Sequence, residues 1–206
     1  IESIKEFPKI INEIKGLRGL NVTIPYKEEI IPYLDKLSKT AEKIGAVNCI
    51  TISKKKKLKG YNTDYHGFKK SIQPLLKEHH KKALILGTGG ASKAIAYALR
   101  SLKIEYDFVS RTADEFQYKY EELDASIFEE YTIIINTTPV GTHPNVNDCP
   151  NLDYSLFTKK HIAYDLIYNP EETAFLRKAK AQGAVTKNGY EMLVLQAEKA
   201  WKIWNE

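Results

Sequence analysis

The feature that most constrains this sequence is a short apolar run that enters a glycine-rich turn and continues into a helical pattern. Residues 83–86 read Ala-Leu-Ile-Leu, as expected of a strand buried on both faces, and Gly87-Thr88-Gly89-Gly90-Ala91-Ser92 follows. Glycines allow a tight strand-to-helix turn, and the helix N-terminus offers unpaired N–H groups to phosphates. The turn fits the first two glycines of G-x-G-x-x-G, but Ser92 stands at the third. It predicts a dinucleotide-binding domain, with a purely structural glycine turn as the alternative.

Strand and helix patterns alternate through the rest of the chain. Downstream of the turn, we expect strands at 106–109, 132–135, 162–165 and 184–187, and helices at 171–182 and 191–204. Upstream, we expect a helix over 4–14, strands at 20–24, 46–53 and 58–61, and a helix from 64 to about 76. Pro25 stands where a further helix can begin. Such alternation predicts an α/β fold with a parallel sheet.

Composition excludes several classes of protein. The formal net charge is +5, but the lysine runs at 54–57 and 81–82 are typical of solvated surface, and no basic segment is interleaved with aromatic residues as in a nucleic-acid module. No apolar run approaches the roughly 18 residues of a membrane span. Cys49 and Cys149 fit reduced thiols, and the five histidines show no metal spacing, so surface or linker positions are expected for them. We therefore expect a cytoplasmic protein without a bound metal and without nucleic-acid or membrane partners.

The residues after the second strand of the downstream region indicate which dinucleotide is bound. An enzyme that uses NAD is expected to carry an acidic residue there, for the ribose hydroxyl. This chain has Ser110-Arg111-Thr112 instead. A guanidinium flanked by two hydroxyls suits the 2′-phosphate of NADP, because arginine binds phosphate oxygens in a bidentate way. The alternative is a solvated surface arginine.

Seven short motifs, in order along nearly the whole chain, resemble those of shikimate dehydrogenases. Individually several are weak, but jointly they are specific. The matching segments are Asn21-Val22-Thr23-Ile24-Pro25-Tyr26-Lys27, Gly45-Ala46-Val47-Asn48, Gly60-Tyr61-Asn62-Thr63-Asp64, Gly87–Ala91, Ser110-Arg111-Thr112, Asn136-Thr137-Thr138-Pro139-Val140-Gly141, and the nine residues from Gly189 to Ala197.

The resemblance implies an activity and a role for each site residue. The activity is the reversible, NADPH-dependent reduction of 3-dehydroshikimate to shikimate, on the route to the aromatic amino acids. Lys27 would be the catalytic acid/base, with Asp64 as its partner and as a ligand of a substrate hydroxyl. The remaining substrate contacts implied are Thr23, Asn48, Tyr168 and Gln196, and the NADP contacts implied are Gly87, Thr88, Gly89, Gly90, Ala91, Ser110, Arg111, Thr112, Thr138, Leu166 and Gly189.

The resemblance also implies two lobes. Residues 1–78 would form an N-terminal α/β substrate lobe, to which a C-terminal helix at 190–206 returns, and residues 79–189 would form a Rossmann-like NADP-binding lobe with a parallel sheet. The substrate would be a small molecule held between the lobes, in a monomer or homodimer.

Two departures from the family pattern keep alternatives open. The family's S-x-S segment, whose hydroxyls bind the substrate carboxylate, has no match in these 206 residues, and Asp114-Glu115 stands where the family often has a second basic residue. The alternatives are an NAD-dependent quinate/shikimate dehydrogenase, against which Arg111 argues, and a non-catalytic dinucleotide-binding protein of the same fold. A protein that merely bound the cofactor would need neither Lys27 nor Asp64.

Overall fold

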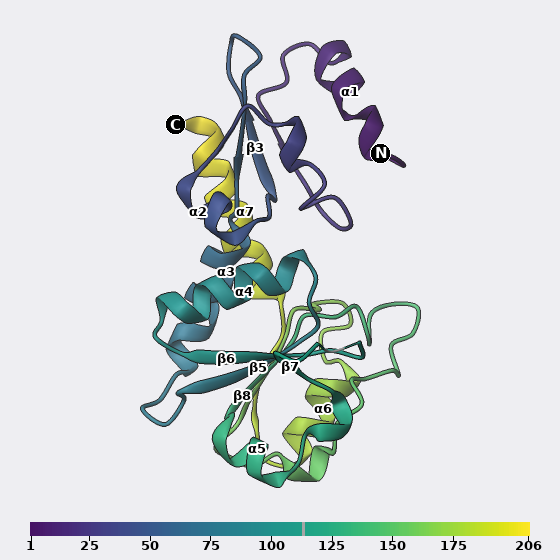
Figure 1. Cartoon of the computed structure of the whole chain (residues 1–206), viewed down its shortest axis with the longest axis vertical. Helices are drawn as coiled ribbons and strands as arrows, with labels where there is room; N and C mark the ends of the chain where they lie inside the picture. The colour runs from purple at the N-terminus through teal and green to yellow at the C-terminus, as the bar shows by residue number, and fades with distance from the viewer. Residues whose placement is uncertain (113) are drawn as a thin grey trace.

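The computed structural model describes residues 1–112 and 114–206, which form two α/β lobes along the long axis of the molecule (Figure 1). The upper lobe in this view contains a four-stranded sheet and both chain termini, and the lower lobe contains a six-stranded sheet. The helices α3 (Asp64–Ile72) and α7 (Tyr190–Asn205) pack extensively against each other where the lobes meet. The expected two-lobed α/β fold is confirmed.

The four-stranded sheet has the order β1-β3-β4-β2. Its strands are β1 (Gly19–Asn21), β2 (Lys36–Leu37), β3 (Cys49–Ile52) and β4 (Leu58–Tyr61), antiparallel except for the parallel pair β2 and β4. The helices of this lobe are α1 (Phe7–Glu13) and α2 (Lys39–Ile44), with 3₁₀ turns at Ile4–Glu6 and Ile31–Tyr33. Its apolar core includes Phe7, Ile30 and Ile50.

The six-stranded sheet is parallel throughout, in the order β10-β9-β8-β5-β6-β7. Its strands are β5 (Lys82–Leu86), β6 (Glu105–Val109), β7 (Gln117–Tyr118), β8 (Ile133–Asn136), β9 (Ile162–Asp165) and β10 (Val185–Lys187). The connecting helices are α4 (Gly90–Ser101), α5 (Ala125–Glu130) and α6 (Ala174–Ala181), and 3₁₀ turns occur at Gln73–Leu75, Tyr120–Glu122 and Tyr154–Leu156.

Helices cover both faces of this larger sheet, as its apolar strands predict. On one face, Ile85 and Ile133 pack with apolar residues of α3 and α4 such as Phe68 and Leu99. On the other face, strand residues such as Leu84 pack with residues of α5 and α6. Because α3 is buried against this sheet while its first residue, Asp64, contacts Lys27 and Asn48 of the smaller lobe, it connects the two lobes.

Four short strands and helices and one turn differ from the sequence-based expectations. The elements α2, α5, β2 and β7 were not predicted, because segments of two to six residues carry too little periodicity. Side chains of Ser38 and Asp124 cap the two short helices instead. Pro25 opens no helix: residues 24–30 form successive hydrogen-bonded turns, such as the one in which the Tyr26 amide donates to the Thr23 carbonyl over 2.9 Å.

Two of the five histidines, for which surface or linker positions were expected, are buried. His80 and His161 are 5% and 3% exposed. Each ring accepts a backbone N–H at Nδ1, from Lys77 over 2.8 Å and from Thr158 over 3.0 Å, and has a backbone carbonyl beside Nε2. Burial lowers the pKa of both rings, which favours their neutral form. Their hydrogen bonds to backbone groups hold together loops beside the sheet.

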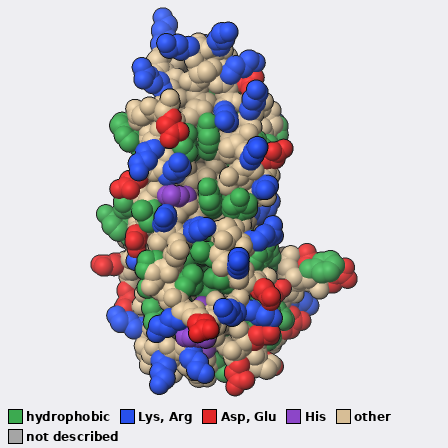
Figure 2. All heavy atoms as spheres, turned by 90° about the vertical axis from the view of Figure 1, so that its left-hand side faces the viewer, with side chains coloured by type: hydrophobic (Ala, Val, Ile, Leu, Met, Phe, Trp, Pro, Cys, Tyr) green, Lys and Arg blue, Asp and Glu red, His purple; other side chains and the backbone are tan. Residues whose placement is uncertain are grey.

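The basic charge lies on the solvated surface. Figure 2 shows lysine and arginine side chains over the whole length of one face, interspersed with acidic groups mostly on its lower part. The lysine run at 54–57 is exposed in the turn between β3 and β4. Among the residues that the structure describes, there is no helix with the length and apolar character needed to cross a membrane.

Candidate active site

A cleft of about 610 Å³ opens where the two lobes meet. Residues from both lobes line it, and ten of the residues predicted from the sequence are among them. These ten are Thr23, Lys27, Asn48, Asp64, Ala91, Thr138, Leu166, Tyr168, Gly189 and Gln196.

Lys27 and Asp64, 37 positions apart in the sequence, form an ion pair at this cleft. The Lys27 Nζ lies 2.7 Å from Asp64 Oδ2, and the two side chains are only 15% and 8% exposed. The Lys27 backbone is held because its carbonyl accepts the Val47 amide over 2.7 Å, and Asp64 is the first residue of α3. The pair therefore presents an ammonium proton beside a fixed carboxylate in a shielded site, which is what protonation of a developing alkoxide requires.

Asn48 connects Asp64 to the last helix. Its Nδ2 donates to Asp64 Oδ1 over 2.9 Å and to Gln196 Oε1 over 3.2 Å, and its Oδ1 accepts the Thr63 amide over 2.6 Å. The Thr63 hydroxyl also lies 3.2 Å from Gln196 Oε1. The network brings three sequence motifs into one group of donors and acceptors, of the kind that a polyhydroxylated ligand needs.

The glycine turn after β5 has the shape of a phosphate site. Gly87 adopts a φ of +98°, and a Cβ there would lie 2.9 Å from the Thr138 side chain. A Cβ at Gly89 would meet no described atom within 4 Å, so open space faces the backbone at the start of α4. No described side chain caps the N-terminus of this twelve-residue helix. The free N–H groups and the helix dipole fit a pyrophosphate.

Ser110, Arg111 and Thr112 follow β6 directly and so lie at the same edge of the sheet as the glycine turn. The Gly87 amide donates to the Val109 carbonyl over 2.9 Å, which ties the two turns together. Arg111 and Thr112 are exposed and lie outside the cleft lining, as do Gly87, Thr88, Gly89 and Gly90. This placement leaves the guanidinium open to a ligand that extends beyond the cleft.

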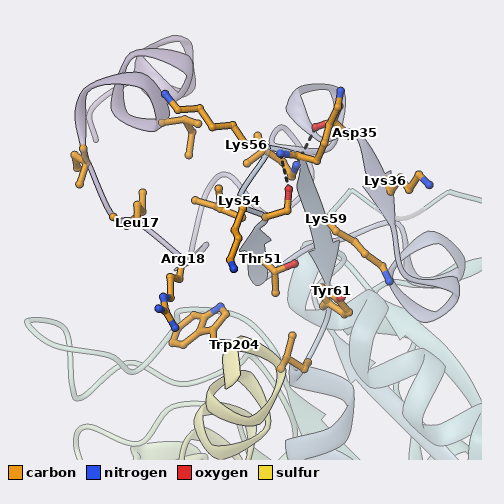
Figure 3. A pocket seen from close by; sticks show the side chains of 18 of the residues that line it. Leu17, Arg18, Asp35, Lys36, Thr51, Lys54, Lys56, Lys59, Tyr61 and Trp204 are labelled. Atoms are coloured by element: carbon orange, nitrogen blue, oxygen red, sulfur yellow. Dashed lines mark hydrogen bonds and ion pairs between the residues drawn. The ribbon is translucent and has the colours of Figure 1, made fainter. Parts of the chain in front are cut away.

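A second hollow, of about 1330 Å³, lies on the smaller lobe between α1, the β3–β4 turn and the end of α7 (Figure 3). Lys54 and Arg18 extend along it near Trp204. None of the residues predicted for catalysis or for binding lines this hollow. Size alone would favour it, but the paired titratable groups and the glycine turn belong to the cleft, so the cleft is the candidate active site.

Comparisons with known proteins confirm the family. The family model described as the shikimate dehydrogenase substrate binding domain matches residues 1–50. A shikimate dehydrogenase (NADP(+)) from Caldanaerobacter subterraneus subsp. tengcongensis is 41% identical over 207 residues, which cover 92% of this chain and 72% of that protein. This chain belongs to the shikimate dehydrogenase family.

Solved structures of the family share the fold. The shikimate dehydrogenase of Aquifex aeolicus matches with a TM-score of 0.85 at 38% identity, covering 98% of this chain and 78% of that one. The shikimate 5-dehydrogenase of Thermus thermophilus, solved in complex with NADP(H) and shikimate, matches with a TM-score of 0.84 at 34% identity and the same two coverages. The family prediction made from the seven motifs is confirmed, and the predicted enzyme class and cofactor agree with the names of these relatives.

Behind the cleft of this shikimate dehydrogenase family member, a buried carboxylate joins two lining segments to the start of α6. Asp165 accepts hydrogen bonds from Thr173 Oγ1 over 2.6 Å, from Asn136 Nδ2 over 3.0 Å and from the Ile167 amide over 3.1 Å. Burial raises the pKa of Asp165 to about 6, although all three donors favour the ionised form. Asn136 Oδ1 in turn accepts from the Thr138 hydroxyl over 2.6 Å.

Sequence reasoning gave no role to Thr63 or to Asp165, although both stood inside quoted segments. His143 is exposed, as expected for a surface residue, and it also lines the cleft, a position that sequence reasoning did not assign to it. The available signal for Thr63 was its place beside Asp64 at the start of a helix. Across residues 1–112 and 114–206, no group of three His, Cys, Asp or Glu side chains could hold a metal ion.

Proposed function

We propose that this chain catalyses the reversible, NADPH-dependent reduction of 3-dehydroshikimate to shikimate. The observation that supports this most directly is the shielded Lys27–Asp64 ion pair, 2.7 Å long, in a cleft that a glycine turn also reaches. The relatives named shikimate dehydrogenase (NADP(+)), at about 40% identity, support the same reaction and cofactor.

In this proposal, Lys27 donates the proton that the developing alkoxide needs, and takes it back in the reverse reaction. Asp64 fixes the position of the ammonium group through the ion pair. Asn48, Thr23, Gln196 and Tyr168 contact the substrate, with Asn48 and Gln196 binding ring hydroxyls. Exclusion of water from the cleft strengthens these contacts, because charges and dipoles interact more strongly in a low dielectric.

For the cofactor, we propose that the glycine turn, Gly87 to Ala91, holds the pyrophosphate and that Ser110, Arg111 and Thr112 hold the 2′-phosphate. Leu166 and Gly189 would line the nicotinamide, which supplies the hydride when NADPH is bound, and Thr138 would be a further cofactor contact. The open space at Gly89 and the uncapped start of α4 support the pyrophosphate assignment.

The same proposal assigns roles to the parts of the chain. Residues 1–78 and 190–206 would bind the substrate, and residues 79–189 would bind NADP. We further propose that the protein acts in the cytoplasm as a monomer or homodimer. The packing of α3 against α7 supports the return of the C-terminal helix to the first part of the chain.

A kinetic comparison tests this function. Wild-type protein should oxidise shikimate with NADP⁺, with NADPH formation followed by absorbance. Lys27→Ala should lower kcat by roughly 10²–10⁴-fold, with a smaller change in KM, because general acid–base catalysis is typically worth that much. Asp64→Asn should also lower kcat, since an amide provides no negative charge beside the ammonium. Lys9→Ala, which removes an exposed lysine of α1, is the control. A Lys27→Ala rate within a few-fold of wild type would contradict the mechanism.

A further inference from the structure

An ion pair between the two lobes joins the segment of Lys27 to the helix that follows the glycine turn. Lys93 Nζ lies 2.5 Å from Glu28 Oε2, and both side chains are about two-fifths exposed. Glu28 directly follows Lys27 in the smaller lobe, whereas Lys93 is in the first turns of α4 in the larger lobe. The pair therefore connects a residue adjacent to the acid/base lysine with an element adjacent to the cofactor turn.

The ion pair between Glu28 and Lys93 lies beside closely packed residues of both lobes. A Cβ at Gly90 would lie 3.4 Å from Lys27 Cβ and 3.5 Å from Glu28 Oε1, so the start of α4 packs closely against residues 27 and 28. Beside Lys93, the buried Ala94 joins Ile44 and Ala46 in a compact apolar cluster between the lobes. Tyr65 and Tyr97 pack against this cluster as well, and the ion pair adds a polar contact between the lobes directly beside Lys27.

We propose that Glu28 and Lys93 are positioning residues, whose ion pair holds Lys27 at a set distance from the cofactor turn. The inference rests on the proposed function, because it assigns the pair to the alignment of proton donor and hydride donor. Alignment matters since reaction rates depend steeply on the approach of the reacting groups. Substrate and cofactor would each still bind when the pair is lost, but less of the bound population would be aligned.

The test is a double-mutant cycle with Glu28→Gln, Lys93→Gln and the double variant. Each single variant should lower kcat about two- to five-fold, the range that partly exposed pairs support, while the Kd of NADPH changes less. The double variant should be no slower than the poorer single variant, because both lose one interaction. The charge-swapped variant Glu28→Lys/Lys93→Glu should recover part of the rate. Glu172→Gln, which breaks an exposed ion pair with Lys180 within the larger lobe, is the matched control.

Two results would overturn the inference. Strictly additive losses in the cycle would show that the two residues act separately. A Lys93→Gln variant that weakens NADPH binding by about tenfold or more, while Glu28→Gln does not, would show that Lys93 is instead a direct phosphate ligand.

A second readout separates failure of this inference from failure of the proposed function. Hydrogen exchange needs no turnover, and both single variants should speed the exchange of amides in residues 24–31 while the Glu172→Gln control leaves them unchanged. If wild-type protein fails to oxidise shikimate but the exchange rates rise in both single variants, the proposed function is wrong and the positioning role of the ion pair is supported. If the exchange rates do not rise in the variants, the positioning role is wrong whatever the activity.

Discussion

Gly67 lies in the middle of α3, where this helix crosses α7, and it offers a sharp test of how the two lobes are joined. A Cβ at this position would lie 2.4 Å from the Met192 carbonyl oxygen and 3.1 Å from both the backbone nitrogen and the Cβ of Gln196. The obstructing oxygen belongs to the backbone of α7, so no side-chain rotation can relieve the contact. Gly67→Ala must push the two helices apart.

The expected magnitude follows from two opposing effects. Replacement of glycine by alanine inside a helix stabilises it by about 1 kcal/mol. Overpacking in a tight interior costs about 1–3 kcal/mol, and a clash with backbone places this site at the upper end. We therefore expect a net loss of about 2 kcal/mol in the free energy of unfolding. For a chain of this size, that corresponds to a fall in Tm of about 4–8 °C.

The assay is urea unfolding followed by far-ultraviolet circular dichroism, with Tm from a thermal scan. Lys70→Ala, on the exposed side of the same helix, is the control and should change stability by less than about 0.5 kcal/mol. Because Gln196 lies against the new methyl group, Gly67→Ala should also lower kcat/KM for shikimate. A Gly67→Ala protein as stable as wild type would refute the claim that close contact between backbones, rather than helix propensity, determines the residue here.

Two further predictions concern the cofactor and acid stability. NADPH should bind more tightly than NADH in calorimetry, and Arg111→Ala should remove most of that preference, about 1.5–3 kcal/mol for a charge-assisted contact; equal wild-type affinities would contradict this. Because His80 and His161 have lowered pKa values, their contribution to stability is complete above the ordinary histidine pKa of about 6.5 and is lost as pH falls through the lowered values. Urea unfolding at several pH values should show that acid lowers the free energy of unfolding less in His161→Gln than in wild type. Identical slopes of this free energy against pH would refute the assignment. Asp165 has the opposite effect, because its raised pKa lowers stability as pH rises from about 4 to about 6, but this effect is common to both proteins and cancels in the comparison.

Local sequence patterns predicted most of the strand positions of the larger sheet well. The expected strand at 162–165 matches β9 residue for residue, and those expected at 83–86 and 106–109 differ from β5 and β6 by one residue each. Strands buried on both faces are continuous apolar runs, and such runs stand out against polar turns. Gly183, the residue after the helix expected at 171–182, has a φ of +89°, a conformation to which glycine is the residue best suited.

Short elements and buried polar groups were beyond local reasoning. Six-residue helices such as α2 depend on a capping serine and on the lobe that they cover. Nothing near His161 in the sequence shows that its ring will meet the Phe128 carbonyl, 33 positions away. Whether a polar residue is exposed or buried depends on partners that only the fold brings within hydrogen-bonding distance.

The sequence by itself therefore determined the family, the parallel sheet and the residue types of the site. The tertiary structure alone decided which of those residues meet. Lys27 and Asp64 pair across 37 positions, and Asn48 reaches Gln196 across 148, because α3 and α7 bring distant segments to one cleft. The interlobe pair of Glu28 and Lys93 has no sequence signature, since hydrophobic periodicity records which face of an element is buried and not which element it is buried against.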